Sequence, residues 1–241
     1  LIYGLSNTCT EAIEIAVEIA EVLRGAIDNT SVVCHGPTIL AAQEVGTVTA
    51  TFAPILHLAD VVVFWGCNPR EAHQNHIARL VMSRGRFVEG RKLRKTMTAD
   101  LADVFIQVEP GRDLELLTAL RMAIKDLEIE APQVAGIPRE KVLELAEMLK
   151  TARYGVLFFG MGLTQNDARY RNIEEAIRLV QELNEWTKFI LLPMRGHYNV
   201  TGANQVLLWN TGYPYSVDFA RGFPRMYVGV TSAVDLLANG D

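Results

Sequence analysis

The chain contains the apolar run Asp60-Val61-Val62-Val63-Phe64-Trp65, which leads directly into the turn-forming residues Gly66-Cys67-Asn68-Pro69. The run does not alternate apolar and polar residues, which is typical of a strand buried on both faces of a parallel sheet. Pro69 is expected to open a helix, because the missing N–H of proline costs least in the first helical turn. The segment therefore predicts a strand, a turn and a helix of an α/β protein.

The same alternation of short β-branched runs and longer amphipathic segments extends along the chain and favours an α/β fold with a largely parallel sheet. We expect strands at residues 2–5, 31–34, 60–65, 104–108, 156–159 and 189–192. We expect helices at residues 10–24, from 113 onward, at 140–149 and at 172–185, and a loop-rich stretch at 196–225. Two lobes are predicted: residues 1–33 with 198–241 form an incomplete first α/β lobe, and residues 34–197 form a second.

The composition is that of a globular enzyme, with 49% hydrophobic and 21% charged residues among 241. A net charge of −5 argues against a nucleic-acid partner, because phosphate binding relies on clustered Lys and Arg. No apolar run approaches the roughly 20 residues that cross a bilayer. Cys9, Cys34 and Cys67 form no CxxC pair, which argues against a structural zinc site and against a disulfide framework. We expect a reducing cytoplasm.

Polar turns that contain glycine follow the predicted strands in several places. Ligands of such sheets bind at the carboxyl ends of the strands, where glycines allow close backbone approach and helix N-termini favour negative charge. We therefore expect these turns to form one long groove along a sheet edge. The turns lie at residues 34–37, 65–69, 109–113, 160–165 and 194–199.

Each of these turns also has an interpretation without function. A Cys such as Cys34 at the end of an apolar strand is usually a small buried hydrophobic residue, although a thiolate beside His35 suits a sulfur-binding metal. Cys67 is expected to contribute packing. The pair Gly160 and Gly162 is a weak dinucleotide signal, and an isolated Arg195 fits a surface ion pair.

Taken together, the motifs form an ordered set that covers nearly the whole chain. The set is Val33-Cys34-His35-Gly36-Pro37, Trp65-Gly66-Cys67-Asn68-Pro69 with Ala72-His73, Thr96-Met97-Thr98-Ala99 with Ala102-Asp103, Arg195-Gly196-His197-Tyr198-Asn199-Val200-Thr201-Gly202, and Thr211-Gly212-Tyr213-Pro214. This set resembles the molybdopterin oxidoreductases and is most similar to the catalytic B subunit of formylmethanofuran dehydrogenase. The resemblance implies Rossmann-like, doubly wound lobes of the formate dehydrogenase/DMSO reductase-like fold.

The resemblance also implies a metal centre. Tungsten or molybdenum is expected to be held by dithiolene sulfurs of two molybdopterin guanine dinucleotides, with Cys34 as the protein ligand. A bound cation favours the thiolate form of such a cysteine. His35 is implied as proton donor or acceptor, a role that contributes about 10²–10⁴-fold to a rate. Arg195 is implied to hold formate or a carbon dioxide oxygen, because its planar fork fits two oxygens.

The remaining turns are implied to hold the two cofactors through close backbone approach and neutral hydrogen-bonding groups. Asp113 is implied to accept from the guanine edge, which presents two adjacent donors. Ser6 and Thr8, at the end of the first strand, are further candidates. The candidate cofactor-binding residues are Gly66, Asn68, Asp113, Gly160, Gly162, Thr164, Gly196 and Asn199.

The reaction implied by the resemblance is reduction of CO2 to formate with electrons from an iron–sulfur cluster, as the first step of methanogenesis from CO2. An amidohydrolase-like subunit then condenses formate with methanofuran, and polyferredoxin-type subunits are further implied partners. Two alternatives stay open. One is a formate dehydrogenase that shares Cys34, His35 and Arg195, and the other is a scaffold homologue without the cofactor. The absence of GxGxxG after the first strand argues against a nicotinamide-binding protein.

The chain departs from the family pattern in two ways. It lacks the cysteine motif for a [4Fe–4S] cluster and ends where a further strand is expected, so we interpret it as a central fragment with the cluster in a missing N-terminal part. It also lacks the strand that the family places before the Thr-x-Thr-Ala motif at 96–99. Deleting an interior strand leaves backbone groups of its neighbours unpaired. We therefore predict that a stretch is missing near Leu93–Arg94.

Overall fold

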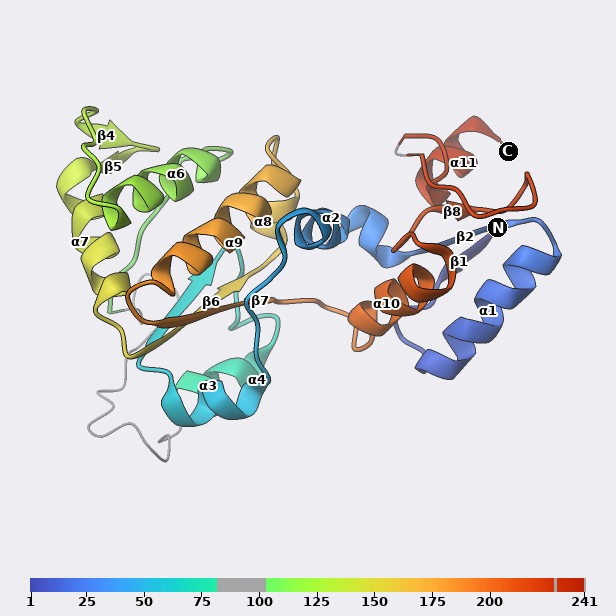
Figure 1. Ribbon diagram of the computed structural model, residues 1–241, viewed down its shortest axis with the longest axis horizontal. Helices are drawn as coiled ribbons and strands as arrows, with labels where there is room; N and C mark the ends of the chain where they lie inside the picture. The colour runs from blue at the N-terminus through green and yellow to red at the C-terminus, as the bar shows by residue number, and fades with distance from the viewer. Residues whose placement is uncertain (82–102, 228, 241) are drawn as a thin grey trace. The chain divides into compact units, whose positions relative to one another are not determined.

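The computed structural model describes residues 1–81, 103–227 and 229–240. The chain divides into two compact units, one of Leu1–Ile39 with Arg195–Asp241 (unit 1) and one of Leu40–Met194 (unit 2) (Figure 1). The boundaries fall within α2 (Gly36–Val45) and just after β7 (Lys188–Pro193). The lobe boundaries expected from the sequence stay a prediction.

A three-stranded parallel sheet organises unit 2. Its strands are β3 (Val61–Trp65), β6 (Tyr154–Phe159) and β7 in the order β3-β6-β7. Every residue of β6 is buried, and successive side chains point to opposite faces. Leu157 and Phe159 join one hydrophobic core, while Val156 and Phe158 join the other. The apolar runs that predicted β3, β6 and β7 therefore reflect burial on both faces.

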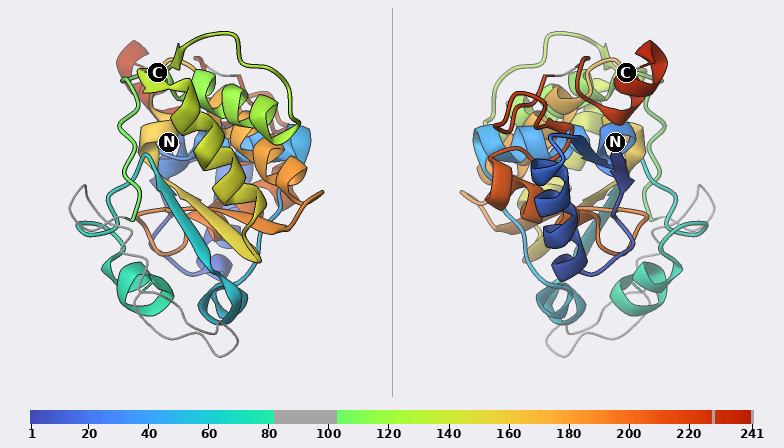
Figure 2. Two further views of the ribbon diagram at one scale, coloured as in Figure 1. Left: turned by 90° about the vertical axis from the view of Figure 1, so that its left-hand side faces the viewer. Right: turned by 90° about the vertical axis from the view of Figure 1, so that its right-hand side faces the viewer.

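Helices cover both faces of this sheet. The helices α6 (Asp113–Ile124), α7 (Arg139–Lys150) and α9 (Tyr170–Leu183) pack on one face, and α3 (Phe52–Leu58) with the π-helical turn Ile77–Val81 packs on the other (Figures 1 and 2). The short elements of unit 2 are α4 (Gln74–His76), β4 (Gln133–Val134), β5 (Ile137–Pro138) and α8 (Met161–Thr164).

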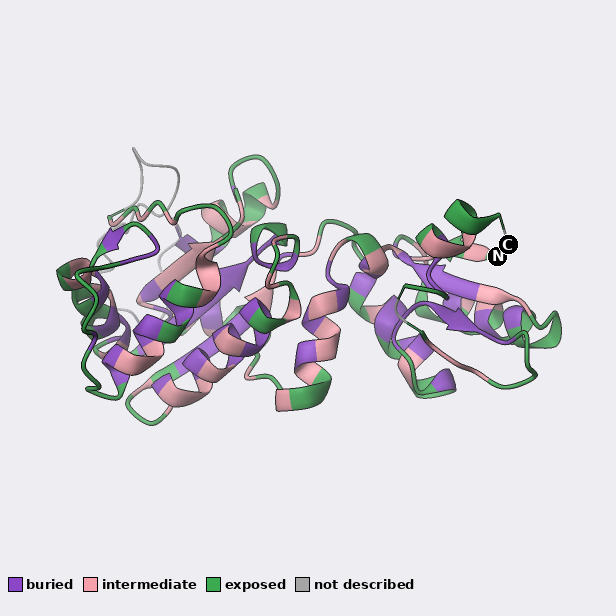
Figure 3. Ribbon diagram, turned by 90° about the horizontal axis from the view of Figure 1, so that it is seen from above, coloured by how far each residue is buried: buried purple, intermediate pink, exposed green. Residues whose placement is uncertain are grey.

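Unit 1 has its own sheet. β1 (Ile2–Gly4) runs parallel to β2 (Ala26–Asn29), and β8 (Val217–Asp218) pairs with β2 in the antiparallel sense. The helices are α1 (Thr10–Val22), α10 (Val200–Thr211) and α11 (Ala233–Asn239). Ile13, Val17, Ile27, Leu207 and Phe219 form much of its core, and Figure 3 shows the buried residues of each unit in purple.

Asp28 ties three segments of unit 1 together. Its buried carboxylate accepts backbone N–H groups from Asn29 at 2.8 Å, Ser216 at 2.8 Å and Ala233 at 2.7 Å. Burial raises the pKa of Asp28, and these hydrogen bonds oppose the rise. Because a buried carboxylate needs such partners, β2, the residue before β8 and the start of α11 are held at one point.

The structure confirms a mixed α/β fold with parallel strands, but several predicted elements are wrong. The strand expected at 31–34 is a 3₁₀ helix, Thr30–Val33, that follows β2. The side chain of Asn29 accepts from the N–H of Ser31 at 2.9 Å, so a local side-chain contact ends the strand early. Pro69 opens a turn, and α4 begins only at Gln74.

Two further corrections concern the second half of the chain. The strand expected at 104–108 does not form, although Ile106 and Val108 still pack against the core of unit 2. The stretch expected to be loop-rich contains α10, because burial of Ala203, Val206 and Leu207 outweighs the weak helix preference of its Gly, Asn and Thr residues. The motif at 96–99 and the stretch predicted to be missing near 93–94 lie outside the described residues.

Within the described part of the chain, every helix is either too short or too polar to span a bilayer.

A core glycine provides a test of this packing. A Cβ added at Gly155, in the middle of the sheet, would lie 2.0 Å from the ring of Phe189. Gly155→Ala should therefore lower the free energy of unfolding by about 1–3 kcal/mol, because the ring has to move within a filled core. Gly25→Ala is the matched control, since its Cβ would meet nothing nearer than 3.9 Å. Urea denaturation of the full-length subunit measures both, and equal midpoints would contradict close packing at Gly155.

Candidate functional site

Cys34 ends the 3₁₀ helix that follows β2. Its backbone N–H donates to the carbonyl of Ser31 at 3.0 Å, and its side chain is half-buried. Burial raises the pKa of the Cys34 thiol, while the guanidinium of Arg195 and the N–H of His35 oppose that rise. A metal cation at the sulfur would reverse the balance in favour of the thiolate.

His35 and Gly36 complete a tight turn after Cys34. His35 is fully buried, and its Nδ1 lies 3.1 Å from the hydroxyl of Thr38. A Cβ at Gly36 would lie 2.9 Å from both the carbonyl of Ser31 and Cζ of Tyr215. Only glycine fits this position, so the turn that carries Cys34 and His35 is closely packed.

Arg195 enters unit 1 from the segment that follows β7. Its Nη1 donates to the hydroxyl of Thr201, in the first turn of α10. Burial lowers the pKa of Arg195 to about 10, and the neighbouring Cys34 opposes the fall. The guanidinium therefore stays charged at neutral pH. Cys34 and Arg195, which are far apart in the sequence, both lie in unit 1, and each influences the pKa of the other.

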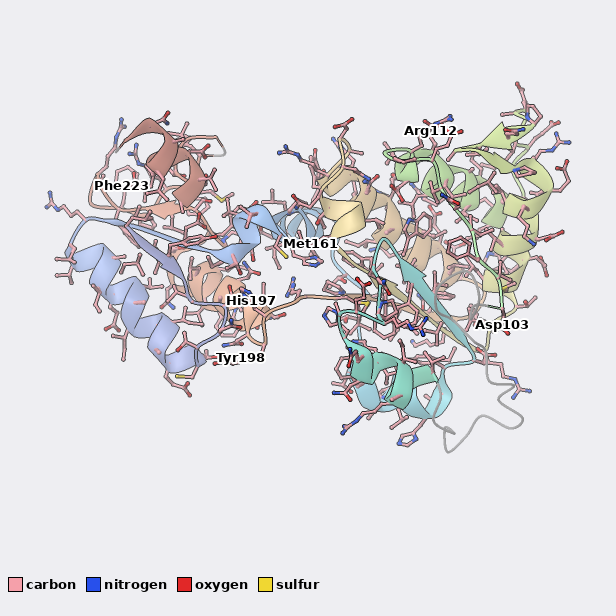
Figure 4. The ribbon with its side chains drawn as sticks, turned by 180° about the vertical axis from the view of Figure 1, so that it is seen from behind. Asp103, Arg112, Met161, His197, Tyr198 and Phe223 are labelled. Carbon is pink, nitrogen blue, oxygen red and sulfur yellow. The ribbon has the colours of Figure 1, made fainter. Side chains whose placement is uncertain are left out.

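The loop before α10 is fastened to the loop after β1. The N–H of Asn199 donates to the carbonyl of Ser6 at 2.9 Å, and its Nδ2 donates to the carbonyl of Thr8 at 2.8 Å. The hydroxyl of Tyr198 donates to the carbonyl of Asn7 at 2.6 Å. Figure 4 labels His197 and Tyr198 on this loop. Asn199 and Ser6 are thus adjacent, and the side-chain amide of Asn199 already donates a hydrogen bond to the loop after β1.

Gly196, in the same loop, behaves differently from the other candidate glycines. It is exposed, and a Cβ built there would meet no atom within 4 Å. Packing therefore does not explain why the position is glycine.

In unit 2 the candidate glycines pack on one another. A Cβ at Gly162 would lie 2.7 Å from Cα of Gly66, and one at Gly160 would lie 2.5 Å from Cβ of Cys67. Gly66 also has a φ of +59°, which favours glycine. Close approach of the loops after β3 and β6 is thus enough to require glycine, and a role of these residues toward a cofactor stays a prediction.

Asp113 is the first residue of α6, and both of its carboxylate oxygens accept hydrogen bonds. Oδ1 accepts from Nε1 of Trp65 at 2.7 Å, and Oδ2 accepts from Nδ2 of Asn166 at 3.0 Å. Asn166 also contacts the carbonyl of Gly162 at 3.3 Å. Sequence reasoning did not predict Trp65 and Asn166 as partners. Trp65 is the last residue of a predicted strand and Asn166 comes directly after the predicted turn at 160–165, so nearness to strand ends was the signal that could have found them.

The other two candidates of unit 2 have local roles. Asn68 is exposed, and its Oδ1 accepts from the N–H of Arg70 at 3.1 Å. Thr164 is buried, with its hydroxyl 3.4 Å from the carbonyl of Met161, a residue labelled in Figure 4.

Three of the five turns follow strands of the sheet of unit 2, with residues 65–69 at the end of β3, 160–165 after β6 and 194–199 after β7. The turn at 34–37 lies in unit 1 beyond the 3₁₀ helix, and the turn at 109–113 follows no strand. A single groove along one sheet edge stays a prediction. Unit 1 contains Cys34, His35, Arg195, Gly196 and Asn199, whereas unit 2 contains Gly66, Asn68, Asp113, Gly160, Gly162 and Thr164.

The donor set fits a metal that takes most of its ligands from a cofactor. Among the residues with described positions, no group of three or more His, Cys, Asp or Glu side chains could hold a metal ion. Cys34 offers one sulfur under the electrostatic influence of a charged guanidinium, and as a thiolate it would suit a heavy, sulfur-binding metal. One protein thiolate added to sulfur ligands from pterin cofactors is consistent with this geometry.

The chain is 49% identical over 251 aligned positions to the B subunit of the tungsten-containing formylmethanofuran dehydrogenase 2 of Methanocaldococcus jannaschii. The alignment covers 100% of this chain and 58% of that relative. The chain belongs to the B-subunit family of the formylmethanofuran dehydrogenases. It therefore spans somewhat more than half of the length of such a relative.

More distant relatives of this B-subunit chain agree with its α/β fold. It is 25% identical over 231 residues to a putative formate dehydrogenase of Bacillus subtilis, with 80% of the chain and 23% of that relative covered. Among solved structures it is similar to a chain of the formyltransferase/hydrolase complex of Methylorubrum extorquens in complex with methylofuran. The TM-score is 0.75 at 22% identity, and the match covers 99% of this chain and 65% of that chain. No protein-family profile matches the chain.

The environment of Cys67 gives a prediction on thiol reactivity. Burial raises the pKa of the Cys67 thiol to about 12, so at about pH 8 only roughly one molecule in 10⁴ carries the reactive thiolate. Cys9 is exposed. Iodoacetamide should therefore modify Cys67 at least about 10²-fold more slowly than Cys9.

The rate at Cys67 should also rise about tenfold per pH unit between about pH 8 and 10, as the thiolate fraction grows. Peptide mass spectrometry of the full-length subunit measures both sites, and guanidinium-unfolded protein is the control in which the difference should disappear. Equal rates in the folded subunit would contradict the buried environment of Cys67.

Proposed function

We propose that the chain is the metal-binding part of the catalytic subunit of a formylmethanofuran dehydrogenase, which reduces CO2 to formate as the first step of methanogenesis from CO2. One observation carries the proposal. In a chain 49% identical along its whole length to the B subunit of a tungsten-containing enzyme, unit 1 contains Cys34, the buried His35 and Arg195, and Arg195 acts electrostatically on Cys34. We further infer Rossmann-like, doubly wound lobes of the molybdopterin oxidoreductase type.

Cys34 would hold the metal through its sulfur. When bound, tungsten or molybdenum with two molybdopterin guanine dinucleotides would supply the two-electron chemistry of the reaction. The charged Arg195 lowers the energetic cost of a thiolate in this half-buried position. The tight turn at Gly36 fixes the direction in which Cys34 leaves the backbone.

His35 and Arg195 would act on the substrate. The planar guanidinium of Arg195 holds the two oxygens of formate, or an oxygen of CO2 as negative charge develops there. His35 is shielded from bulk water, Thr38 contacts its Nδ1, and we assign the proton exchange to its imidazole ring. The two side chains thus orient the substrate and hold its proton.

The remaining candidates would contact the cofactors. Asp113 is oriented by Trp65 and Asn166 and would accept from guanine, because each carboxylate oxygen keeps a second lone pair. The exposed Gly196 would allow close backbone approach. Gly66, Asn68, Gly160, Gly162, Thr164 and Asn199 complete the proposed set.

Electrons would come through a [4Fe–4S] cluster of the enzyme, which would receive them from polyferredoxin-type subunits. An amidohydrolase-like subunit would condense formate with methanofuran. We place the complex in the cytoplasm.

Replacing the proposed ligand is the direct test. Cys34→Ala should abolish formate turnover by the purified complex and lower its content of tungsten or molybdenum, because the protein ligand is lost. Cys67→Ala removes a thiol of the same kind from a packing position and should retain metal and turnover. Elemental and pterin analysis together with formate oxidation measures both variants. Comparable activity in the two variants would show that Cys34 is not the metal ligand. A native complex without metal or pterin would refute the enzymatic proposal.

Arg195→Lys tests the substrate contact. Lysine keeps the charge but cannot bind two oxygens with a planar fork. Loss of a charge-assisted hydrogen bond of about 1.5–3 kcal/mol should lower kcat/KM for formate by about 10- to 150-fold with the metal content unchanged. Steady-state kinetics of the complex measures this ratio, and a wild-type value would exclude the assigned role.

A second candidate is a scaffold subunit without the cofactor. The similarity in fold to a chain of a formyltransferase/hydrolase complex favours it. A formate dehydrogenase is the other alternative, and the 25% identity to a putative formate dehydrogenase supports it less than the 49% match supports our proposal. Metal analysis separates the scaffold from both enzymes, and co-purification of an amidohydrolase-like subunit separates the two enzymes.

A further inference from the structure

A buried polar network is joined to the Cys34 turn within unit 1. It contains Asn29 at the end of β2, Ser31 in the 3₁₀ helix and Asn204 in α10, all at most 1% exposed. The backbone carbonyl of Pro214 completes it. The network therefore links segments that are far apart in the sequence.

The side chains of the network form hydrogen bonds with one another and with the carbonyl of Pro214. Asn29 accepts from the N–H of Ser31 at 2.9 Å and donates to the carbonyl of Pro214 at 3.0 Å. The hydroxyl of Ser31 donates to Oδ1 of Asn204 at 2.9 Å. Nδ2 of Asn204 donates to the carbonyl of Pro214 at 3.1 Å and to Oδ1 of Asn29 at 3.4 Å. Each amide side chain thus uses both its donor and its acceptor.

Asn204 is connected both to the turn that contains Cys34 and to Arg195. On one side it binds Ser31, whose carbonyl accepts from the N–H of Cys34 at 3.0 Å. On the other side its helix, α10, holds Arg195 through Thr201, which lies one turn before Asn204. The same helix therefore fixes the Cys34 turn and the guanidinium.

Stability alone does not require this network. Buried polar partners can often be replaced together by apolar side chains at little cost, whereas leaving one partner unmet is expensive. A fully satisfied polar network favours a single arrangement, because every donor has to meet its acceptor. Such a network is useful where two chain segments have to be placed accurately relative to each other.

We propose that Asn204 is a positioning residue, which holds the Cys34 turn through Ser31 against the helix that holds Arg195. In this way it sets the separation between the metal-ligating sulfur and the substrate-binding guanidinium. The inference rests on the proposed function. A displacement of about 1 Å in such a site can lower a rate about 10²-fold.

The test uses the purified complex with variants of the full-length subunit. Asn204→Leu keeps a similar size but removes all hydrogen bonds of the side chain. Ser31→Ala removes the hydroxyl that donates to Oδ1 of Asn204, and Ser31→Thr restores such a hydroxyl. Ser232→Ala is the matched control, because Ser232 is another buried hydroxyl of unit 1 and caps α11 by accepting from the N–H of Asp235.

We expect Asn204→Leu and Ser31→Ala to retain metal and pterin, to lower kcat for formate about 10²-fold and to shift the electron paramagnetic resonance g-values of the reduced metal centre. Ser31→Thr should approach the wild type. Ser232→Ala should lower stability but leave kcat and g-values unchanged. Two results would overturn the positioning role. One is a wild-type kcat together with wild-type g-values in Asn204→Leu. The other is a loss of kcat in every variant in proportion to its loss of stability.

Hydrogen exchange of the Cys34 amide provides a readout that does not depend on the metal. In the subunit without cofactor, this amide should exchange faster in Asn204→Leu than in the wild type or in Ser232→Ala. Unchanged exchange would overturn the role of Asn204 whatever the activity shows. A native complex without tungsten, molybdenum or pterin would refute the proposed function separately, and the exchange rates would still decide whether Asn204 holds the turn.

Discussion

Two adjacent polar residues at the end of β2, Asp28 and Asn29, impose the constraint on which unit 1 depends. Both are fully buried, so both have to find hydrogen-bonding partners within the protein. Beside the local N–H groups of Asn29 and Ser31, partners come from the other end of the chain: Ser216 and Ala233 for Asp28, and Pro214 for Asn29. Satisfying this pair therefore brings the C-terminal segments to the strand after which the Cys34 turn begins.

Unit 2 depends on a different constraint, the burial of β6 on both faces. The side chains of β6 pack into two hydrophobic cores, one on each face of the sheet. The ring of Phe189 fills the space that a side chain at Gly155 would need. The turn beyond β3 and α8 beyond β6 are hydrogen-bonded, with the N–H of Gly162 donating to the carbonyl of Gly66 at 2.9 Å, and this close approach requires glycine at both positions. Glycines that looked like a cofactor-binding signature in the sequence are thus explained first by contact between two loops. Gly196 is the exception, because no neighbour fills the space of its missing side chain.

The sequence predicted much of the architecture and less of the site. Long apolar runs and amphipathic helices were placed correctly where a single periodicity dominates, as in β6 and α9. Predictions failed where a local side-chain contact or distant packing decided the outcome. Asn29 caps a 3₁₀ helix in place of the strand expected at 31–34, and α10 forms because three of its side chains enter the core of unit 1. For the site, the family resemblance selected Cys34, His35 and Arg195, but no sequence pattern pointed to Trp65, Asn166 or Asn204 as supporting partners of the candidate residues.

By itself the sequence determined the α/β class, the parallel strands of unit 2 and membership of the B-subunit family, because apolar periodicity and motif order are properties of the linear chain. Only the tertiary structure decided that the candidate residues divide between two units and that Cys34 and Arg195 share one of them. It also decided that Asn204 belongs to the network beside them. The physical reason is that a buried polar group is satisfied by whichever partner the fold delivers, and the sequence around an asparagine does not specify a partner 173 residues away.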